Sequence, residues 1–214
     1  MAVCLFFDVV YIICKKQNKL IIGLIAKCIA ALCFITIGYL GFKRHDSSFN
    51  YLILIGLILD GIGDLFLAIR NIAFKQAAFI IGALSFLAGH IFYIKAQFPI
   101  ANIYQLQCMF IGIMAGSILM YYFDSVCRLK RGYKLLGIVY CIMISIMASL
   151  SVGIYLTNTI RPNLLFMIGS IMFMCSDFIL VLNQFSKKKP WMHPIYSLLY
   201  FIAQLLISYS LFII

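Results

Sequence analysis

Charged residues are scarce in this chain. Asp, Glu, Lys and Arg together make up 11% of its 214 residues, only six residues are acidic, and 65% are hydrophobic, with a mean hydropathy of +1.09. A soluble domain has about 25% charged and about 45–50% apolar residues. A core of this size cannot bury so much apolar surface, so a soluble globular fold is excluded and lipid must solvate much of the chain.

The sequence also lacks the alternation of polar and apolar residues that a membrane-spanning β-barrel needs. Its apolar stretches are uninterrupted, which is typical of helices in a bilayer. The first stretch is short and contains Asp8. We predict an all-α, polytopic transmembrane helix bundle of about eight spans, forming one integral membrane domain over residues 1–214. The predicted spans are at about residues 2–14, 20–42, 50–69, 77–97, 103–123, 134–156, 163–182 and 192–214.

Several catalytic signatures are missing. The chain has no GxSxG nucleophile elbow and no GxxxxGK[ST] or GxGxxG phosphate loop. Its eight cysteines form no CxxC pair and most lie inside apolar stretches, so we expect buried small side chains rather than disulfides or metal ligands. The three histidines, His45, His90 and His193, fall too far apart to converge on a zinc ion. We therefore expect neither a metal nor a cofactor.

Positive charge gathers between the apolar stretches. The net charge of +11 would suggest nucleic acid in a soluble protein, but here Lys and Arg stand where they orient spans and meet anionic headgroups, so we expect no nucleic-acid partner. We number each loop by the predicted span that it follows. Few Lys and Arg residues lie in the even loops, which hold Lys43, Arg44, Lys95 and Arg161. The positive-inside rule then places the odd loops in the cytoplasm and both termini on the non-cytoplasmic side, by default of a bacterial inner membrane. The odd loops carry Lys15, Lys16, Lys19, Arg70, Lys75, Arg128, Lys130, Arg131, Lys134, Lys187, Lys188 and Lys189.

Five ionisable residues stand inside the predicted spans: Lys27, Asp60, Asp64, His90 and Asp177. A charge at the centre of a membrane helix costs about 2.5–3.5 kcal/mol on insertion scales, and it usually faces the bundle interior and serves a function. At about 1.5 Å per residue, Lys27 and the three aspartates fall in one layer of the membrane. His90 falls somewhat past the middle and joins this layer only if its helix tilts or the cavity is deep.

The carboxylates of this layer suggest proton chemistry. Asp60 and Asp64 are four residues apart, so they share one face of a helix. Two carboxylates in a low dielectric do not both ionise comfortably, so one is expected to stay protonated, whereas Lys27 would keep another charged. A protonated acid beside an ionised carboxylate is suited to general acid–base catalysis. The same groups would also serve a proton-coupled transporter or a channel.

Ordered motifs in four spans resemble the YhhN-like lysoplasmalogenase family of eight-span membrane proteins. The third predicted span reads LILIGLILDGIGDLFLAI with its GD, the fourth has GHIFY, the seventh has SD ahead of a basic loop, and the last has AQ. Lys27 also fits, although Cys28 follows it where the family often has proline. The resemblance implies hydrolysis of the vinyl ether bond of a lysoplasmalogen within the membrane, which releases a fatty aldehyde and a glycerophospho-ethanolamine or -choline.

Joining the resemblance to the chemistry gives a hypothesis for the site. Asp64 and Asp177 would form the catalytic pair, one donating a proton and the other stabilising the cation and activating water, with neither role assigned. Asp60 would tune Asp64, His90 would orient a carboxylate or hold polar groups of the substrate, and Lys27 would pair with a carboxylate or reach toward the headgroup phosphate. The expected hydrogen-bond partners are Tyr93, Tyr140, Tyr200 and Gln204.

Two other functions use the same residues differently. A proton-coupled transporter or lipid flippase would give flux without a product, but the sequence shows no clear repeat and no pair of broken helices. A non-catalytic scaffold or sensor would use the buried acids for structural pairing only. If the enzyme hypothesis holds, the single-chain lipid tail would lie among Phe, Leu and Ile side chains, and the headgroup would enter from the cytoplasmic side.

Overall fold

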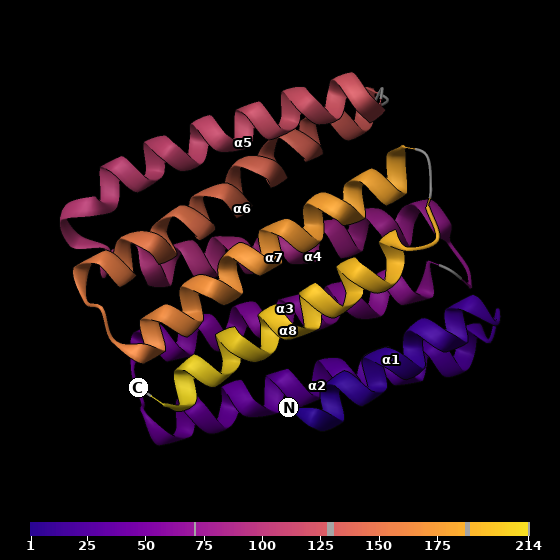
Figure 1. Cartoon of the computed structure of the whole chain (residues 1–214), viewed down its shortest axis with the longest axis horizontal. Coiled ribbons are helices and arrows are strands. Elements are labelled where there is room, and N and C mark those ends of the chain that lie inside the picture. Colours follow the sequence, from indigo (N-terminus) through magenta and orange to yellow (C-terminus); the bar gives the residue numbers. More distant parts are fainter. Residues whose placement is uncertain (71, 128–130, 187–188, 214) are drawn as a thin grey trace.

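Every regular element in the described part of the chain is a helix, which confirms the predicted all-α fold (Figure 1). The computed structural model describes residues 1–70, 72–127, 131–186 and 189–213. Each predicted apolar stretch corresponds to one α-helix. The elements are α1 (Ala2–Lys16), α2 (Leu20–Arg44), α3 (Ser48–Ile69), α4 (Lys75–Gln97), the 3₁₀ helix η1 (Asn102–Tyr104), α5 (Gln105–Cys127), α6 (Arg131–Thr157), α7 (Arg161–Phe185) and α8 (Met192–Phe212).

Seven of the described helices, α2 to α8, are long and apolar enough to cross a membrane. The helix α1 has 15 residues and is about 22 Å long, short of the hydrocarbon thickness of about 30 Å. Figure 1 shows that α1 runs beside only part of α2. The chain is therefore an integral membrane protein, and its described residues form seven helices of spanning length and the shorter helix α1.

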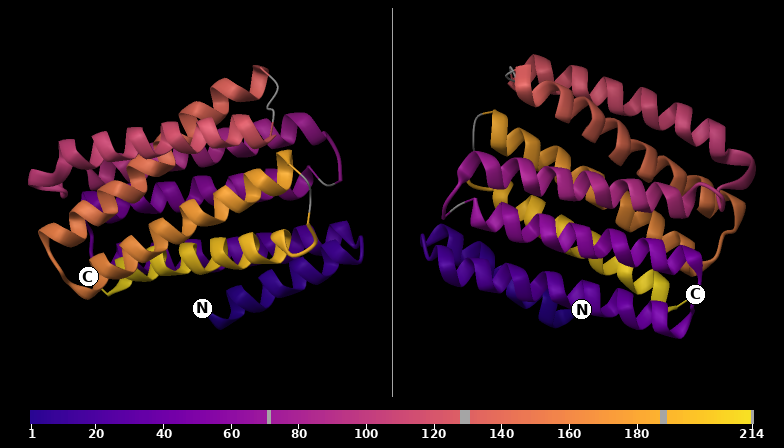
Figure 2. Two further views of the ribbon diagram at one scale, coloured as in Figure 1. Left: turned by 45° about the horizontal axis from the view of Figure 1, so that its top comes forward. Right: turned by 180° about the vertical axis from the view of Figure 1, so that it is seen from behind.

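Six of the helices close into a ring. Each of α2, α3, α4, α6, α7 and α8 packs against the next in that order, and α8 packs against α2. The two remaining helices lie outside this ring: α1 on α2 and α8, and α5 chiefly on α6 (Figure 2). Because the helices run alternately up and down, the loops after α1, α3, α5 and α7 share one end of the bundle, which we call the odd-loop end (Figure 1, right).

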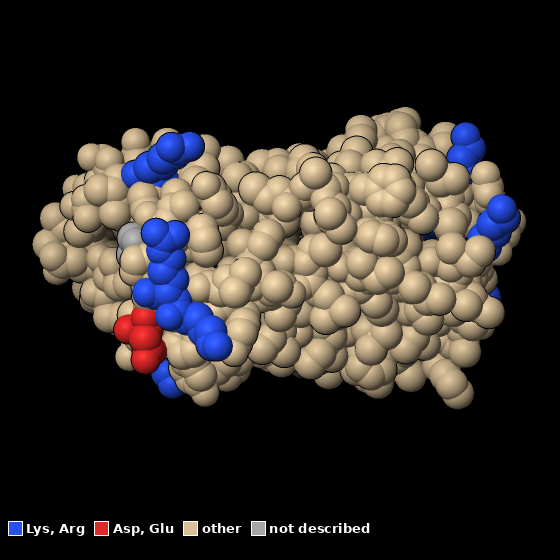
Figure 3. All heavy atoms as spheres, turned by 90° about the horizontal axis from the view of Figure 1, so that it is seen from below, with Lys and Arg blue, Asp and Glu red and all other residues tan. Residues whose placement is uncertain are grey.

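The outer surface of the bundle suits lipid. Large apolar side chains such as Phe6, Ile21, Leu106 and Leu135 are exposed, whereas charge collects at the two ends of the face in Figure 3. Which end faces the cytoplasm stays a prediction. Among the residues on which that orientation rests, Arg128, Lys130, Lys187, Lys188 and the side chain of Arg131 lie outside the described part of the structure.

The interior of the ring differs between its two halves. Toward the loops after α2, α4 and α6 it is filled by fully buried apolar side chains, among them Ile53, Ile207 and Leu211. Toward the odd-loop end it contains Lys27, Asp64 and Asp177 and a cavity, which are described below. The cysteines form no disulfide, since all eight are free.

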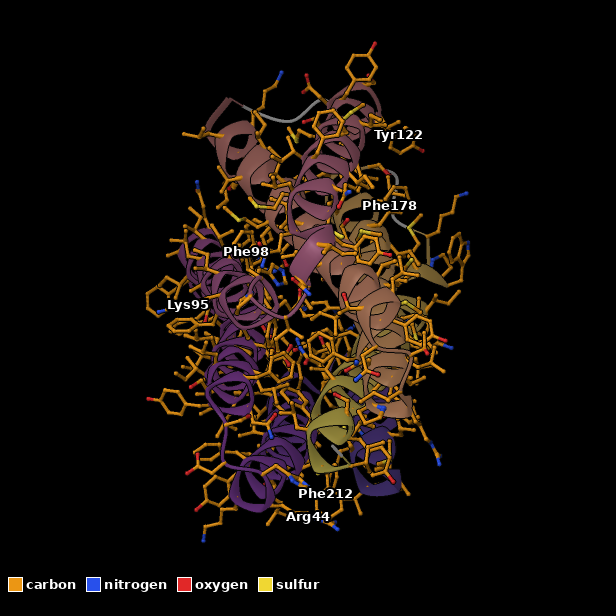
Figure 4. The ribbon with its side chains drawn as sticks, turned by 90° about the vertical axis from the view of Figure 1, so that its left-hand side faces the viewer. Arg44, Lys95, Phe98, Tyr122, Phe178 and Phe212 are labelled. Carbon is orange, nitrogen blue, oxygen red and sulfur yellow. The ribbon has the colours of Figure 1, made fainter. Side chains whose placement is uncertain are left out.

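The outlying helix α5 depends on glycine for its contact with α6. A Cβ atom on Gly116 would lie 2.5 Å from the Cα of Ile142, so the two backbones approach more closely than any side chain allows. Gly112 stands four residues earlier and makes the same kind of contact, which gives the small-xxx-small spacing of close helix pairs. Tyr122 of α5 also stacks on Phe178 of α7 at 5.8 Å between ring centroids (Figure 4).

We expect Gly116→Ala to lower the free energy of unfolding by about 1–3 kcal/mol, because the added methyl group forces α5 away from Ile142. The measurement is thermal unfolding of the protein in detergent. Gly132→Ala is the matched control, since a Cβ atom there meets nothing within 4 Å and alanine favours a helix. Equal stability of the two variants would show that the close α5–α6 contact is not needed.

Candidate functional site

The candidate site lies inside the ring, and all six helices of the ring contribute to it. The polar side chains of these helices face the interior of the ring because they are costly in contact with lipid. Lys27 comes from α2, Asp60 and Asp64 from α3, and Asp177 from α7. The remaining predicted residues are His90 and Tyr93 from α4, Tyr140 from α6, and Tyr200 and Gln204 from α8.

Asp64 forms a buried ion pair. The Nζ of Lys27 lies 2.9 Å from Oδ1 of Asp64, and the side chains are 10% and 2% exposed. The hydroxyl of Tyr200 donates a hydrogen bond of 2.7 Å to the other carboxylate oxygen. The Lys27 ammonium also lies 5.5 Å from the centre of the Tyr11 ring. Both oxygens of Asp64 therefore accept from donors that favour a negative charge.

Asp177 has a different environment. The hydroxyl of Tyr140 donates a 2.5 Å hydrogen bond to its Oδ2. Within the described residues, no Lys, Arg or His lies within ion-pair distance of Asp177, in contrast to Asp64. Asp177 is also more exposed, at 9% against 2%. The two carboxylates thus differ in the charge that each has beside it.

Asp64 and Asp177 line the same cavity, which has a volume of about 100 Å³. Lys27, Tyr140 and Tyr200 line it as well, so the structure brings five of the predicted residues around one space. The rest of the wall is mainly apolar and aromatic, which suits the hydrocarbon part of a lipid. Among these apolar residues are Leu67, Phe79, Phe86, Phe123, Val181 and Phe185.

Asp60 lies behind this cavity rather than on its wall. Its Oδ2 accepts hydrogen bonds from the hydroxyl of Tyr93 at 2.6 Å and from Nε2 of Gln204 at 2.7 Å. Asp60 is fully buried. A Cβ atom on Gly89 would lie 2.6 Å from Oδ1 of Asp60, so the glycine lets α4 approach the carboxylate. Asp60 and Asp64 share a helix face, as predicted, but they have separate hydrogen-bond partners.

His90 also lies behind the cavity wall. Its ring is fully buried and contacts Tyr140 and Phe173, with centroid separations of 5.2 and 5.1 Å. Neither ring nitrogen has a hydrogen-bond partner among the described residues. Side chains on a helix lean toward its N-terminus, and the N-terminus of α4 is at the odd-loop end, so His90 and Tyr93 reach back toward the carboxylates. The predicted role of His90 stays a prediction.

Sequence analysis did not select Asp8 as a site residue. Asp8 is fully buried on α1 and accepts a 2.6 Å hydrogen bond from the hydroxyl of Ser197, which lines the cavity. An ionisable group inside an apolar stretch was the signal that could have found it. Tyr11, Ser176 and Tyr196 line the cavity too, but nothing in their spacing distinguishes them from packing residues.

The buried pair gives a direct test of the site. We expect Lys27→Met to destabilise the protein by about 3–5 kcal/mol, because it leaves the Asp64 carboxylate buried without its cation. The double variant Lys27→Met with Asp64→Asn should recover most of this loss, since both charges are then gone. Unfolding in detergent measures both. A double variant no more stable than Lys27→Met would contradict a coupled pair.

Comparisons with known proteins agree with the resemblance seen in the motifs. A model of the YhhN family matches residues 22–211, a segment that runs from the first turn of α2 almost to the end of α8 and contains every predicted site residue. No curated protein and no solved structure gives a significant match. Since the family model covers most of its length, the chain belongs to the YhhN family.

Proposed function

We propose that this protein hydrolyses the vinyl ether bond of lysoplasmalogens. Membership of the YhhN family is consistent with a lysoplasmalogenase-like function. The observation that carries the proposal is the pair Asp64 and Asp177 on the wall of one largely apolar cavity, where only Asp64 has a cation beside it among the described residues. Acid-catalysed cleavage of a vinyl ether begins with a proton donor, and an anion beside the donor stabilises the cation that forms.

The reaction begins with protonation at carbon. Asp177 holds the proton in this proposal, because no cation of the described residues stabilises its charged form as Lys27 does for Asp64. The proton moves to the β-carbon of the vinyl ether, the carbon–carbon double bond becomes a single bond, and an oxocarbenium ion forms at the carbon bonded to oxygen. The ionised Asp64 stabilises this cation electrostatically.

Water then completes the reaction. A water molecule adds to the oxocarbenium carbon and passes a proton to a carboxylate of the pair, which gives a hemiacetal. The hemiacetal then collapses: a carboxylic acid of the pair protonates the glycerol oxygen as its bond to carbon breaks, and a carboxylate of the pair takes the proton of the hemiacetal hydroxyl. The products are an aldehyde and an alcohol. One water is consumed and the carboxyl proton is restored, so the step resembles the chemistry of carboxylate-pair glycosidases.

The other buried residues hold the pair in place. The hydroxyls of Tyr140 and Tyr200 each fix one carboxylate by a hydrogen bond. Asp60 is a positioning residue, one helical turn from Asp64 and tied to α4 and α8 by Tyr93 and Gln204. The tail of a single-chain lipid would lie against the apolar and aromatic wall of the cavity.

We expect Asp64→Asn and Asp177→Asn each to reduce the rate of aldehyde release at least about 100-fold. This factor is the lower end of the rate enhancement that a general acid or base supplies. The assay uses the purified protein in detergent with lysoplasmenylethanolamine, and the saturated alkyl-ether analogue as the substrate control. Asp124→Asn is the matched variant, since Asp124 lies away from the cavity, 40% exposed and paired with Lys134. It should keep the wild-type rate.

A folded wild-type protein that releases no aldehyde would contradict the proposed reaction and would turn attention to proton-coupled transport. A near-normal rate in either Asp64→Asn or Asp177→Asn would contradict the carboxylate pair while leaving hydrolysis standing.

Protonation at carbon makes a second prediction. In D₂O the released aldehyde should carry one deuterium on the carbon next to the carbonyl, introduced on a single face because the acid is fixed in the cavity. Immediate reduction to the alcohol prevents exchange, and mass spectrometry with a chiral derivative reads the outcome. An aldehyde without that deuterium would exclude carbon protonation, and deuterium on both faces would exclude a fixed acid.

A further inference from the structure

A second, smaller pocket adjoins the cavity on the side of the odd-loop end. The two spaces share part of their walls, including Tyr11, Lys27 and Tyr196. The wall of the smaller pocket is polar where that of the cavity is apolar: it adds Lys15, Arg70, Asn183 and Gln184. Lys27 therefore stands between the carboxylate of Asp64 and this polar pocket.

The polar pocket is strongly cationic. Lys15, Lys27 and Arg70 come from three different helices or their ends, and none of the described residues on its wall is acidic. Asp64 offsets the charge of Lys27. Lys15 and Arg70 therefore supply the net positive charge of the pocket, an arrangement that favours an anionic ligand. Arg70 is the member whose geometry identifies the ligand.

Arg70 is held in position by two contacts. Its Nη2 donates a 2.9 Å hydrogen bond to Oε1 of Gln184, and its guanidinium lies 5.2 Å from the centre of the Phe79 ring. A guanidinium presents several donors in a planar fork that matches phosphate oxygens, so its other N–H groups suit a phosphate. Because the amide oxygen of Gln184 accepts from Arg70, its amide nitrogen remains available as a donor, and Gln184 lines the same pocket.

The spacing between the two sites suits a lysophospholipid. Arg70 follows Asp64 by six residues on the same helix end, and Gln184 follows Asp177 by seven. Both steps lead toward the odd-loop end and correspond to about 9–10.5 Å along the axis. In a lysoplasmalogen the vinyl ether oxygen and the phosphorus are five bonds apart. The arginine side chain bridges part of the axial distance, so both groups of one molecule can be bound at once.

We propose that the polar pocket binds the phosphodiester of the lysophospholipid headgroup, with Arg70 as the main ligand and Lys15 and Lys27 completing the cationic wall. The inference rests on the proposed function for the substrate and extends it: the substrate must carry a phosphate, and the phosphate sets which bond reaches Asp64 and Asp177. Free phosphate has the same chemistry, so the test separates the two sources.

Binding of two non-hydrolysable ligands tests the pocket without turnover. One is a saturated 1-O-alkyl lysophosphoethanolamine, and the other is the 1-O-alkylglycerol with the same chain, which lacks the phosphate. The full-length protein in maltoside detergent should bind the first about 10–100-fold more tightly, as expected for one or two charge-assisted hydrogen bonds. Arg70→Gln should remove most of this preference and leave the affinity for the alkylglycerol within about twofold of wild type.

Three further variants make the result specific. Lys95→Gln removes one positive charge at the opposite end of the bundle, where the side chain points outward (Figure 4), and it should keep the full phosphate preference. Arg70→Lys should retain part of the preference, since it keeps the charge but not the fork. Lys15→Gln, at a separate position on the wall, should reduce the preference even if Arg70→Gln folds poorly.

Inorganic phosphate is the other ligand with the chemistry that the polar pocket would bind. At millimolar concentration it should weaken binding of the lysophosphoethanolamine by wild type, leave binding of the alkylglycerol unchanged, and have no effect on Arg70→Gln. Equal affinity of wild type for the two lipids would overturn the proposal. So would phosphate binding that depends on Arg70 without any preference for the phosphate-bearing lipid, because the pocket would then hold free phosphate only.

The outcome is independent of catalysis. A phosphate preference in a protein that releases no aldehyde would keep the headgroup pocket and reject hydrolysis, whereas aldehyde release without a phosphate preference would do the reverse. If both proposals hold, Arg70→Gln should raise KM for lysoplasmenylethanolamine at least about 10-fold and change kcat little, the pattern of lost ground-state binding.

Discussion

The ion pair between Lys27 and Asp64 is the constraint around which the interior is organised. In an apolar ring each of these charges is tolerable only because the other lies 2.9 Å away. The pair therefore fixes the depth and the rotation of α2 relative to α3. Tyr200 adds α8 to the same point through its hydrogen bond to Asp64. Once α3 is fixed in this way, Asp60 one turn away must face α4 and α8, where Tyr93 and Gln204 meet it.

Three buried carboxylates in one ring are given three different environments. Asp64 has a cation, Asp60 has two neutral donors and no access to the cavity, and Asp177 has one phenol and the most exposed position of the three. Groups of one chemical type take different roles when their surroundings differ in charge and in access. The proposed mechanism uses this difference: Asp64, with a cation beside it, serves as the anion, and Asp177 serves as the acid.

Much of this arrangement could be predicted from the sequence, for a physical reason. A bilayer requires long apolar helices, so hydropathy locates them, and the rise per residue then gives the depth of Lys27, Asp64 and Asp177. The rotation of each helix about its axis could not be predicted, because helices surrounded by lipid are apolar on every face.

Sequence reasoning therefore proposed Tyr140 and Tyr200 beside Tyr93 without separating the residues of the cavity wall from the one behind it. It also gave no role to Asp8, since a short stretch interrupted by a carboxylate is a weak membrane signal.

The uneven interior of the ring has a consequence for the lipid bilayer as a whole. One half contains buried side chains such as Ile53 and Leu211, and the other half holds the cavity and the polar pocket. A lipid headgroup crosses the hydrocarbon region only at a high cost in free energy, so the lipids of the two leaflets exchange slowly. If the proposed function holds, the substrate comes from the leaflet on the odd-loop side, and molecules in the opposite leaflet become available only as fast as they flip.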